Sequence, residues 1–599
     1  MAMRYDIVMV TYNSEKWLRG CVQALASVNY PKEELHLVFA DNASQDGTLS
    51  LLEQLRAEHP QFGGFTIVRG AKNMGFGAAC NAGARAGSAG MLLFLNVDTA
   101  ADAGVFHALD EAAAARPQAG GFECRQLPRE MGHHFDPVTL ETPWASGAAF
   151  CVRRPVFTAV GGFDEHIFMY CEDIDLSWRI RARGAPLYYV PQALVYHFVL
   201  NRENVQASSL REYAGTQLGN LLLSYKYGTL RQMLQANAEY LRTLRRPQHF
   251  AHVRRVLGKQ YLSHFRRVPG FAGWRRHNRA LFRAAGTAPV CAAQHLLAPT
   301  HAPERGRFVL EAPVRMGPKF SVIVRTCSRP QSLRKTLQTL RWQTYRNFEV
   351  IVAEDGEPAS RAMIEQEFSD LPIRYLCTGT RQGRGKNGNM GLRAAVGEYL
   401  NLLDDDDYFY PDHLELMAAK ANEHPQADLI LGCAMVMKVD MKDEAEWRYE
   451  VKAVHSMHFD RVDLFTMCQS CQIPIQSAVF KKSLFEACGG LHEDMEGNED
   501  WFMWMRFLAK GRRIDPEHVD IDRATSVFVL PAGEKQTAER IEKYRKYNKL
   551  FYENPELQFQ VSLADMRRFC DGMIADMQCM EACGKLHIYL ENMANRDSE

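Results

Sequence analysis

The sequence predicts an α/β fold made of two copies of one domain in tandem. Three observations support this prediction: the chain length, an alternation of short apolar runs with helical spacing, and an ordered set of polar motifs that occurs twice. At 599 residues the chain is much longer than a typical domain of about 100–200 residues. Two or three hydrophobic cores are therefore expected.

Residues 1–115 alternate apolar runs with segments of helical spacing. The expected strands are Asp6–Val10, Leu35–Ala40, Phe65–Val68 and Met91–Leu95. The expected helices between them are Glu15–Val28, Gly47–Arg56 and Gly77–Ala86. Strands that alternate with helices indicate βαβ units and a parallel sheet, whose ligand crevice lies at the carboxyl ends of the strands.

Residues 320–420 repeat this pattern. The expected strands are Phe320–Val324, Phe348–Ala353, Ile373–Leu376 and Tyr399–Leu403, and helices are expected from Gln331, Ser360, Lys386 and Pro411. The predicted organisation is a first α/β domain (1–230), a basic helical region with a proline-containing linker (231–318), a second α/β domain (319–530) and a helical C-terminal extension (531–599).

Polar motifs stand at the ends of the apolar runs, in the same order in both halves. In the first half they are Thr11-Tyr12-Asn13, Asp41-Asn42, Asn73-Met74-Gly75-Phe76-Gly77 with Asn81-Ala82-Gly83, Asn96-Val97-Asp98 and Glu172-Asp173. In the second half they are Arg325-Thr326, Glu354-Asp355, Gly383-Arg384-Gly385 with Asn389-Met390-Gly391, Asp404-Asp405-Asp406-Asp407 and Glu499-Asp500. Two ordered sets indicate two copies of one catalytic domain.

Charge and cysteine content narrow the class of protein. Lys plus Arg and Asp plus Glu are both 71, so the formal net charge is zero, whereas a nucleic-acid binder is normally basic. No apolar run approaches the roughly 18 residues that span a bilayer, and the first residues lack a signal-peptide layout. The 15 cysteines are scattered, which is typical of reduced thiols in a cytoplasmic protein.

The segment from Leu241 to Val290 has no acidic residue, but arginines and aromatic residues recur through it. One interpretation is an amphipathic surface that lies on an anionic membrane leaflet. The other, which we favour on the sequence, is a helical connector whose arginines are solvated or paired with flanking domains.

The acidic motif after the fourth strand suggests metal chemistry. Asp404 and Asp406 suit a hard divalent cation shared with a diphosphate. The first copy has Asn96-Val97-Asp98 there and so keeps one carboxylate. The alternative is that such acids only cap the following helix.

Glu172-Asp173 and Glu499-Asp500 each open an expected helix after a glycine turn. A carboxylate at such a position could act as general base on an acceptor hydroxyl. Capping and the helix dipole alone would also favour acids there. The glycine motifs would permit close backbone approach to phosphate or ribose, although they follow the third strand and are not a Rossmann fingerprint.

The order of these motifs closely resembles family 2 glycosyltransferases over about residues 4–225 and 319–530. In the first copy Ala145-Ser146-Gly147-Ala148, Gly161-Gly162-Phe163-Asp164 and Val195-Tyr196-His197 add to the resemblance, which is greatest with rhamnosyltransferases of polysaccharide assembly. The second copy resembles a different branch. The resemblance implies two GT-A domains (Rossmann-like, nucleotide-sugar-binding) and inverting transfer from a nucleoside-diphosphate sugar.

The resemblance also assigns roles to residues. It implies Asp173 and Asp500 as catalytic bases. It implies a divalent metal, Mn²⁺ or Mg²⁺, held by Asp98 and His197 in the first copy and by Asp404 and Asp406 in the second. It places the nucleotide sugar near Thr11, Asn13, Asp41, Asn42, Asn73, Gly75 and Asn81 in the first copy, and near Thr326, Glu354, Asp355, Gly383, Arg384, Asn389 and Asp405 in the second. The departures from the family pattern are Asn96, Glu354 in place of Asp, and the lack of a histidine in Ser526-Val527-Phe528-Val529.

The functional expectation is a bifunctional glycosyltransferase that adds two sugars to a cell-surface or lipid-linked glycan. Its donors would be a dTDP-sugar such as dTDP-rhamnose in the first domain and a UDP-sugar in the second. It would work in the cytoplasm, peripherally at the inner face of the cytoplasmic membrane, without nucleic acid. The alternatives are one active domain with a degenerate binding domain, or a non-catalytic carbohydrate-binding scaffold.

Overall fold

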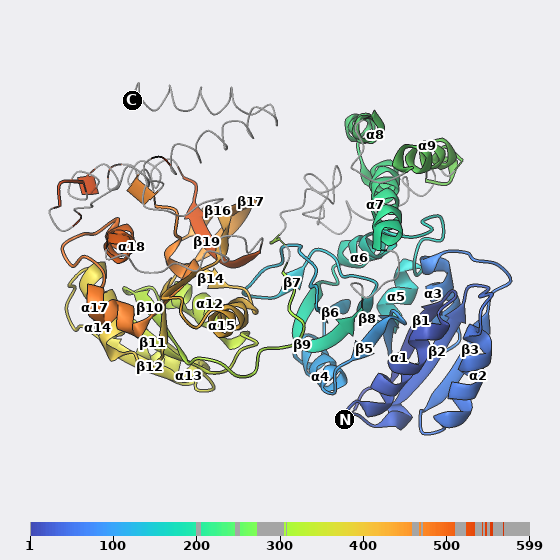
Figure 1. The fold of residues 1–599 in the computed structure, drawn as a ribbon, viewed down its shortest axis with the longest axis horizontal. Coiled ribbons are helices and arrows are strands. Elements are labelled where there is room, and N and C mark those ends of the chain that lie inside the picture. The colour runs from blue at the N-terminus through green and yellow to red at the C-terminus, as the bar shows by residue number, and fades with distance from the viewer. Residues whose placement is uncertain are drawn as a thin grey trace.

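The structure is a computed structural model. It describes residues 2–198, 205–245, 252–266, 268–271, 305–306, 308–457, 467–468, 471–509 and 523–533, with a few short stretches beyond residue 540. Two sheet-bearing regions follow one another along the chain (Figure 1). Most of the predicted C-terminal extension and residues 272–304 of the predicted linker lie outside the described residues.

The first sheet has the strand order β3-β2-β1-β4-β8-β6-β9-β5, with β7 paired to β9. Its strands are β1 (Tyr5–Thr11), β2 (Leu35–Asp41), β3 (Gly64–Arg69), β4 (Met91–Leu95), β5 (Thr99–Ala101), β6 (Gly121–Leu127), β7 (Glu141–Thr142), β8 (Ala149–Arg153) and β9 (Leu187–His197). Its helices are α1 (Glu15–Ser27), α2 (Thr48–Glu58), α3 (Phe76–Arg85), α4 (Val105–Ala115), α5 (Arg154–Val160) and α6 (Glu172–Ala182). The strands β1 to β4 pair in parallel, as predicted.

The second region repeats the parallel strands of the first, but its strands form two sheets. One sheet has the order β12-β11-β10-β13-β18-β15, and a second has the order β14-β19-β16-β17. The strands are β10 (Phe320–Thr326), β11 (Phe348–Glu354), β12 (Ile373–Cys377), β13 (Tyr399–Asp404), β14 (Tyr408–Phe409), β15 (Leu429–Leu431), β16 (Cys433–Asp443), β17 (Arg448–Met457), β18 (Ala478–Lys481) and β19 (Ala524–Pro531). The helices are α12 (Pro330–Arg341), α13 (Arg361–Glu367), α14 (Arg384–Ala394), α15 (His413–Glu423), α17 (Lys482–Cys488) and α18 (Glu499–Ala509).

Strand register makes the two copies directly comparable. Tyr5 lies opposite Met91 on β4, and Phe320 lies opposite Tyr399 on β13. Counting along the strands from these pairs, Val10 corresponds to Arg325 and Asn96 corresponds to Asp404. By the same count Asp98 corresponds to Asp406.

Side chains alternate between the two faces of the first sheet. On β1, Ile7 and Met9 belong to the core under α1 and α4, whereas Val8 belongs to the core under α3 and α6. This alternation follows from the period of two in a strand, and it explains the continuous apolar run, because helices cover both faces. Among the described residues, no helix is long and apolar enough to cross a membrane.

The two regions share a buried interface. Phe135 and Tyr189 of the first pack in one apolar cluster with Tyr410 and Met435 of the second. Charged groups are buried beside this cluster: Arg125 pairs with Glu415 at 2.8 Å, and Arg523 pairs with both Glu130 and Asp412. Arg305, on the connecting segment, also pairs with Asp412.

Arg523 is 1% exposed, so its removal should destabilise the protein strongly. In Arg523→Ala, Glu130 and Asp412 stay buried without this partner, and we expect the free energy of unfolding to fall by about 3–5 kcal/mol. Arg448→Ala, which removes an exposed pair with Asp443, serves as the control and should change stability little. Chemical denaturation of both variants measures the difference, and equal effects would contradict a stabilising role for the buried pairs.

Candidate active sites

Both candidate sites lie at the carboxyl ends of the parallel strands. In the first copy Thr11 ends β1 and Asp41 ends β2, and Thr11 Oγ1 donates to Asp41 Oδ1 at 2.9 Å. Ser44 also donates to Asp41 through its backbone N–H, at 3.0 Å. Thr11 and Asp41 are buried, so this pair fixes the floor of the site. The structure therefore brings these two predicted residues together.

Asn42 ties the loop after β2 to the loop after β3. Its Oδ1 accepts from the Met74 N–H at 3.1 Å, and its Nδ2 donates to the Gly75 carbonyl at 3.0 Å. Two other predicted residues lie at the rim of the site. Asn13 Oδ1 accepts from the Gln45 N–H, and Asn73 Oδ1 accepts from the Gly75 N–H.

In the second copy an acidic residue connects the corresponding loops, those after β11 and β12. Asp355 accepts from the N–H groups of Gln382 at 2.7 Å and Gly383 at 3.0 Å. Glu354 accepts instead from the Ser360 N–H and hydroxyl. Its longer side chain therefore turns to the helix that follows, which accounts for Glu at the place of Asp41.

The predicted glycine and asparagine positions hold the local fold. Gly75 and Gly383 have φ of +91° and +96° directly before α3 and α14, a conformation that favours glycine. Asn81 Nδ2 donates to the Phe163 carbonyl, and Asn81 Oδ1 accepts from the Phe163 N–H, at 2.9 and 2.8 Å. Asn389 makes the matching pair of bonds to Leu491. Both amide side chains are hydrogen-bonded to the backbone segment that leads to the Glu-Asp helix, so we assign them a structural role.

The predicted metal ligands of the first copy converge. His197 Nε2 lies 3.4 Å from Asp98 Oδ1 and 3.5 Å from Asn96 Nδ2. On the other side of the ring, Nδ1 lies 3.0 Å from Gln126 Oε1, so Gln126 orients the imidazole. An imidazole nitrogen and a carboxylate at this spacing are a suitable donor set for a divalent cation that also binds a diphosphate.

Asp173 lies in the first turn of α6. Its Oδ2 accepts from the Gly147 N–H at 2.9 Å, and its Oδ1 accepts from the Ile174 N–H at 2.8 Å. Burial raises the pKa of Asp173 despite these bonds. Burial also raises the pKa of Glu172 well above its ordinary value, and Glu172 Oε2 has no hydrogen-bond partner among the described residues.

The backbone before each Glu-Asp pair is strained, which sequence patterns did not indicate. Tyr170 and Cys171 have φ of +70° and +68°, and Asn498 has φ of +61° in the second copy. Each such residue costs on the order of 1 kcal/mol or more and needs surrounding structure to hold it. Strain of this kind gathers where side chains must be aimed, here the acids of α6 and α18.

Arg325 gives the second site a different electrostatic character. Its Nε donates to Asp404 Oδ1 at 2.7 Å, and its Nη1 donates to Glu499 Oε1 at 3.0 Å. Arg325 is 5% exposed. Burial alone would raise the pKa of Asp404, but Arg325 holds it below its ordinary value. In the first copy the corresponding residues are Val10 and Asn96, so the positive and negative groups are absent together.

The remaining acids of the second motif are also paired with arginine. Arg329 Nη1 lies 2.9 Å from Asp406 Oδ2, and Arg329 also pairs with Asp405. Thr326 Oγ1 donates to Asp405 Oδ2 at 2.6 Å, a bond that Val97 does not permit in the first copy. The predicted metal carboxylates Asp404 and Asp406 thus each face a guanidinium, and among the described residues no cluster of three or more His, Cys, Asp or Glu side chains forms a metal site.

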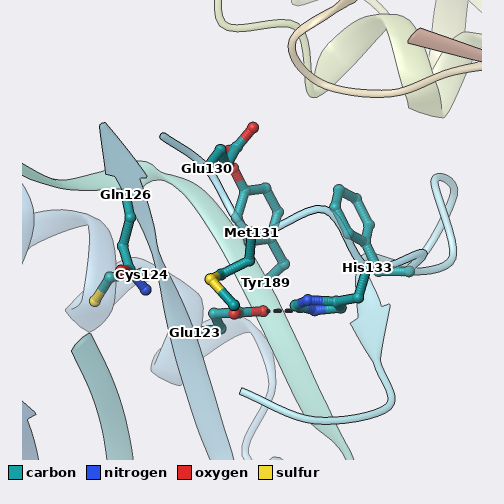
Figure 2. Close-up of a pocket in the computed structure, with 8 residues that line it drawn as sticks. Glu123, Cys124, Gln126, Glu130, Met131, His133 and Tyr189 are labelled. Carbon is teal, nitrogen blue, oxygen red and sulfur yellow. Dashed lines mark hydrogen bonds and ion pairs between the residues drawn. The ribbon is translucent and has the colours of Figure 1, made fainter. Parts of the chain in front are cut away.

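A pocket that the sequence did not reveal adjoins the first site (Figure 2). It is lined by Glu123 and Gln126 of β6, together with His133 and Tyr189. The pairing of β6 with β9 is irregular here, because Cys124 lies opposite Val190 whereas Arg125 lies opposite Leu194, so the extra residues are on β9. Glu123 accepts from the Ser146 N–H at 3.2 Å, so this pocket connects the loop that holds Asp173 with the residue that orients His197.

Comparison with known proteins identifies the family. The model of "Glycosyl transferase family 2" matches residues 6–134 and 321–486. An N-acetylglucosaminyl-diphospho-decaprenol L-rhamnosyltransferase of Mycobacterium tuberculosis is 30% identical over 238 residues, which cover 32% of this chain and 75% of that protein. The chain belongs to glycosyltransferase family 2.

Two other similar proteins are matched over different shares of their length. An uncharacterized glycosyltransferase of Haemophilus influenzae is 28% identical over 189 residues, and the match spans 32% of this chain and 62% of that relative. A mannosyltransferase of Pyrobaculum calidifontis, solved with GDP-Man and Mn²⁺, is 16% identical with a TM-score of 0.33, over 48% of this chain and 86% of that chain. Family membership confirms the predictions of a glycosyltransferase and of two GT-A domains in tandem, and it argues against a non-catalytic scaffold.

In this family 2 enzyme, Arg325 and Asp404 should behave as one exchangeable unit. Arg325→Val removes the buried guanidinium from Asp404 and leaves Glu499 with Arg384 at 3.5 Å, and it should lower stability by about 3–5 kcal/mol. Adding Asp404→Asn, which recreates the Val10 and Asn96 pair of the first copy, should recover about 1–3 kcal/mol. Denaturation of both single variants and the double variant completes the cycle; effects that add within about 0.5 kcal/mol would refute the coupling.

Proposed function

We propose that the chain is a bifunctional inverting glycosyltransferase that transfers two sugars from nucleotide donors to a growing glycan. The observation that supports this proposal is that both copies hold a carboxylate, Asp173 or Asp500, in the first turn of a helix. In both, the same asparagine bonds hold the approach to that helix, through Asn81 and Asn389. A degenerate copy would not need the strained backbone of Cys171 and Asn498.

The proposed reaction follows from these positions. Asp173 or Asp500 accepts the proton of an acceptor hydroxyl, and the oxygen then attacks the anomeric carbon from the face opposite the diphosphate. The bond from that carbon to the diphosphate oxygen breaks, its electron pair stays on the diphosphate, and the configuration inverts. The donor's nucleotide would lie over the Thr11 and Asp41 pair, and over Thr326 and Asp355 in the second copy.

A divalent metal, when bound, would neutralise charge on the departing diphosphate. In the first copy Asp98 and His197 would hold it. In the second copy the arginine pairs of Asp404 and Asp406 do not fit a two-carboxylate site, and we propose that Arg325 and Arg329 provide positive charge there.

The donors and acceptor are proposals drawn from relatives and resemblance. The mycobacterial relative is named as a rhamnosyltransferase acting on a decaprenol-linked sugar, which supports dTDP-rhamnose for the first domain and a lipid-linked glycan as acceptor. A UDP-sugar for the second domain rests on the sequence resemblance alone. Such an acceptor would place the enzyme at the inner face of the cytoplasmic membrane.

Separate substitutions of the two bases test bifunctionality. Release of nucleotide from a panel of nucleotide sugars, with and without Mn²⁺, is measured for the wild type, Asp173→Asn and Asp500→Asn. Loss of a general base lowers the rate about 10²–10⁴-fold, so each variant should lose a different donor. Glu111→Gln and Asp494→Asn, both exposed, are matched controls. If one variant keeps every activity, the copy that carries the substitution is a binding domain. This is the second candidate function, and the arginine-paired acids favour it for the second copy.

The pH dependence of the second site should reveal its base. Burial, with Glu499 nearby, raises the pKa of Asp500 to about 6. A general base acts when deprotonated, so kcat/KM should fall about tenfold per pH unit below this pKa and level off above it. The profile is measured in Asp173→Asn, where the second site acts alone. A plateau that extends down to pH about 4, the ordinary range of Asp, would contradict the assignment.

A further inference from the structure

Three helices form a small bundle on the first domain. They are α7 (Val205–Tyr227), α8 (Leu230–Arg245) and α9 (Val253–His264). Leu221, Ala236, Tyr240 and Leu257 are buried together between them. Tyr240 also donates to the Leu257 carbonyl at 3.1 Å, so α8 and α9 are held side by side.

The outer faces of α8 and α9 expose large apolar side chains. On α8, Leu230 is 67% exposed and Leu234 is 63% exposed, and Leu241 continues this stripe two turns later. On α9, Leu262 is 73% exposed and Phe265, just after the helix, is 51% exposed. Single exposed apolar residues are ordinary, but repeated ones along neighbouring helices mark a contact surface.

Basic side chains lie among these apolar ones. The exposed basic residues are Arg231, Arg242, Arg245, Arg254, Arg255, Lys259 and Arg266. The acidic residue of these two helices is Glu239, which is paired with Arg242. Apolar side chains framed by basic ones fit the interface of an anionic bilayer. The sequence of residues 272–303 is itself basic, so charge disfavours that segment as a cover for this surface.

The bundle is joined to the helix that carries the candidate base. Lys226 of α7 is buried and pairs with Asp164 and Asp175, and the Tyr227 hydroxyl donates to Asp175 at 2.7 Å. Asp175 belongs to α6, two residues after Asp173. Figure 1 shows α7 running from α6 out to α8 and α9. A surface that binds the outer faces of α8 and α9 therefore has a fixed relation to the first active site.

We propose that the outer faces of α8 and α9 bind the surface of an anionic lipid bilayer. The leucines and Phe265 enter the headgroup region while the arginines and Lys259 contact acidic headgroups. Resting on the proposed function, the consequence is that the first site is held beside lipid-linked acceptors. The binding itself needs neither donor nor acceptor.

Sedimentation of the full chain with vesicles tests this surface. We expect binding to vesicles that contain phosphatidylglycerol and little binding to pure phosphatidylcholine. The variant Arg254→Ser with Arg255→Ser and Lys259→Ser should bind on the order of 100-fold more weakly, since each charge contributes about fivefold. Leu230→Glu with Leu262→Glu should also lose binding. The controls are Arg19→Ser with Arg56→Ser and Arg361→Ser, and Met316→Glu, which alter exposed residues elsewhere.

Several results would overturn the inference. They are absence of vesicle binding by the wild type, equal binding to both kinds of vesicle, and equal loss in the control variants. If the leucine variant instead changes the sedimentation coefficient of vesicle-free protein, the surface is a contact between two copies of the chain. Nucleotide release without vesicles is independent of these outcomes, so failure here is distinguishable from failure of the proposed function.

Discussion

The parallel pairing of the central strand with its two neighbours is the constraint on which both sites depend. With β1 between β2 and β4, and β10 between β11 and β13, the polar residues that end each strand must meet at one edge. Close packing of the following helix keeps that edge narrow. A Cβ on Gly83 would lie 2.6 Å from Val8, and one on Gly391 would lie 2.4 Å from Ile323. These glycines therefore allow the helix to pack close to the sheet.

The same scaffold supports two electrostatic solutions. The first copy uses Val10 and Asn96, keeps a single carboxylate at Asp98 and adds His197. The second copy carries Asp404 but places Arg325 beneath it, so the additional negative charge is compensated within the protein. A carboxylate motif must therefore be interpreted together with the residue opposite it on the neighbouring strand, because a basic residue there compensates the negative charge.

Much of the fold could be predicted because it depends on local patterns. The strands and helices of both parallel sheets follow apolar runs and turns, and the structure places the ends of most of them within one or two residues of the prediction. The convergence of Asp98 and His197 required only the family's motif order. Other features depend on contacts that no local pattern contains. The bond from the Ser146 N–H to Glu123, the bonds between Asn81 and Phe163 and the pairing of Arg325 with Glu499 each join distant segments.

Because the interface between the two regions is buried, the two domains are best made as one polypeptide. Arg125 and Glu130 of the first region pair with Glu415 and Arg523 of the second, so each half alone would lose these partners and expose an apolar surface to water. The two domains are thus poorly suited to exist as separate polypeptides. Their stoichiometry is fixed at one to one, so neither domain is made in excess of the other.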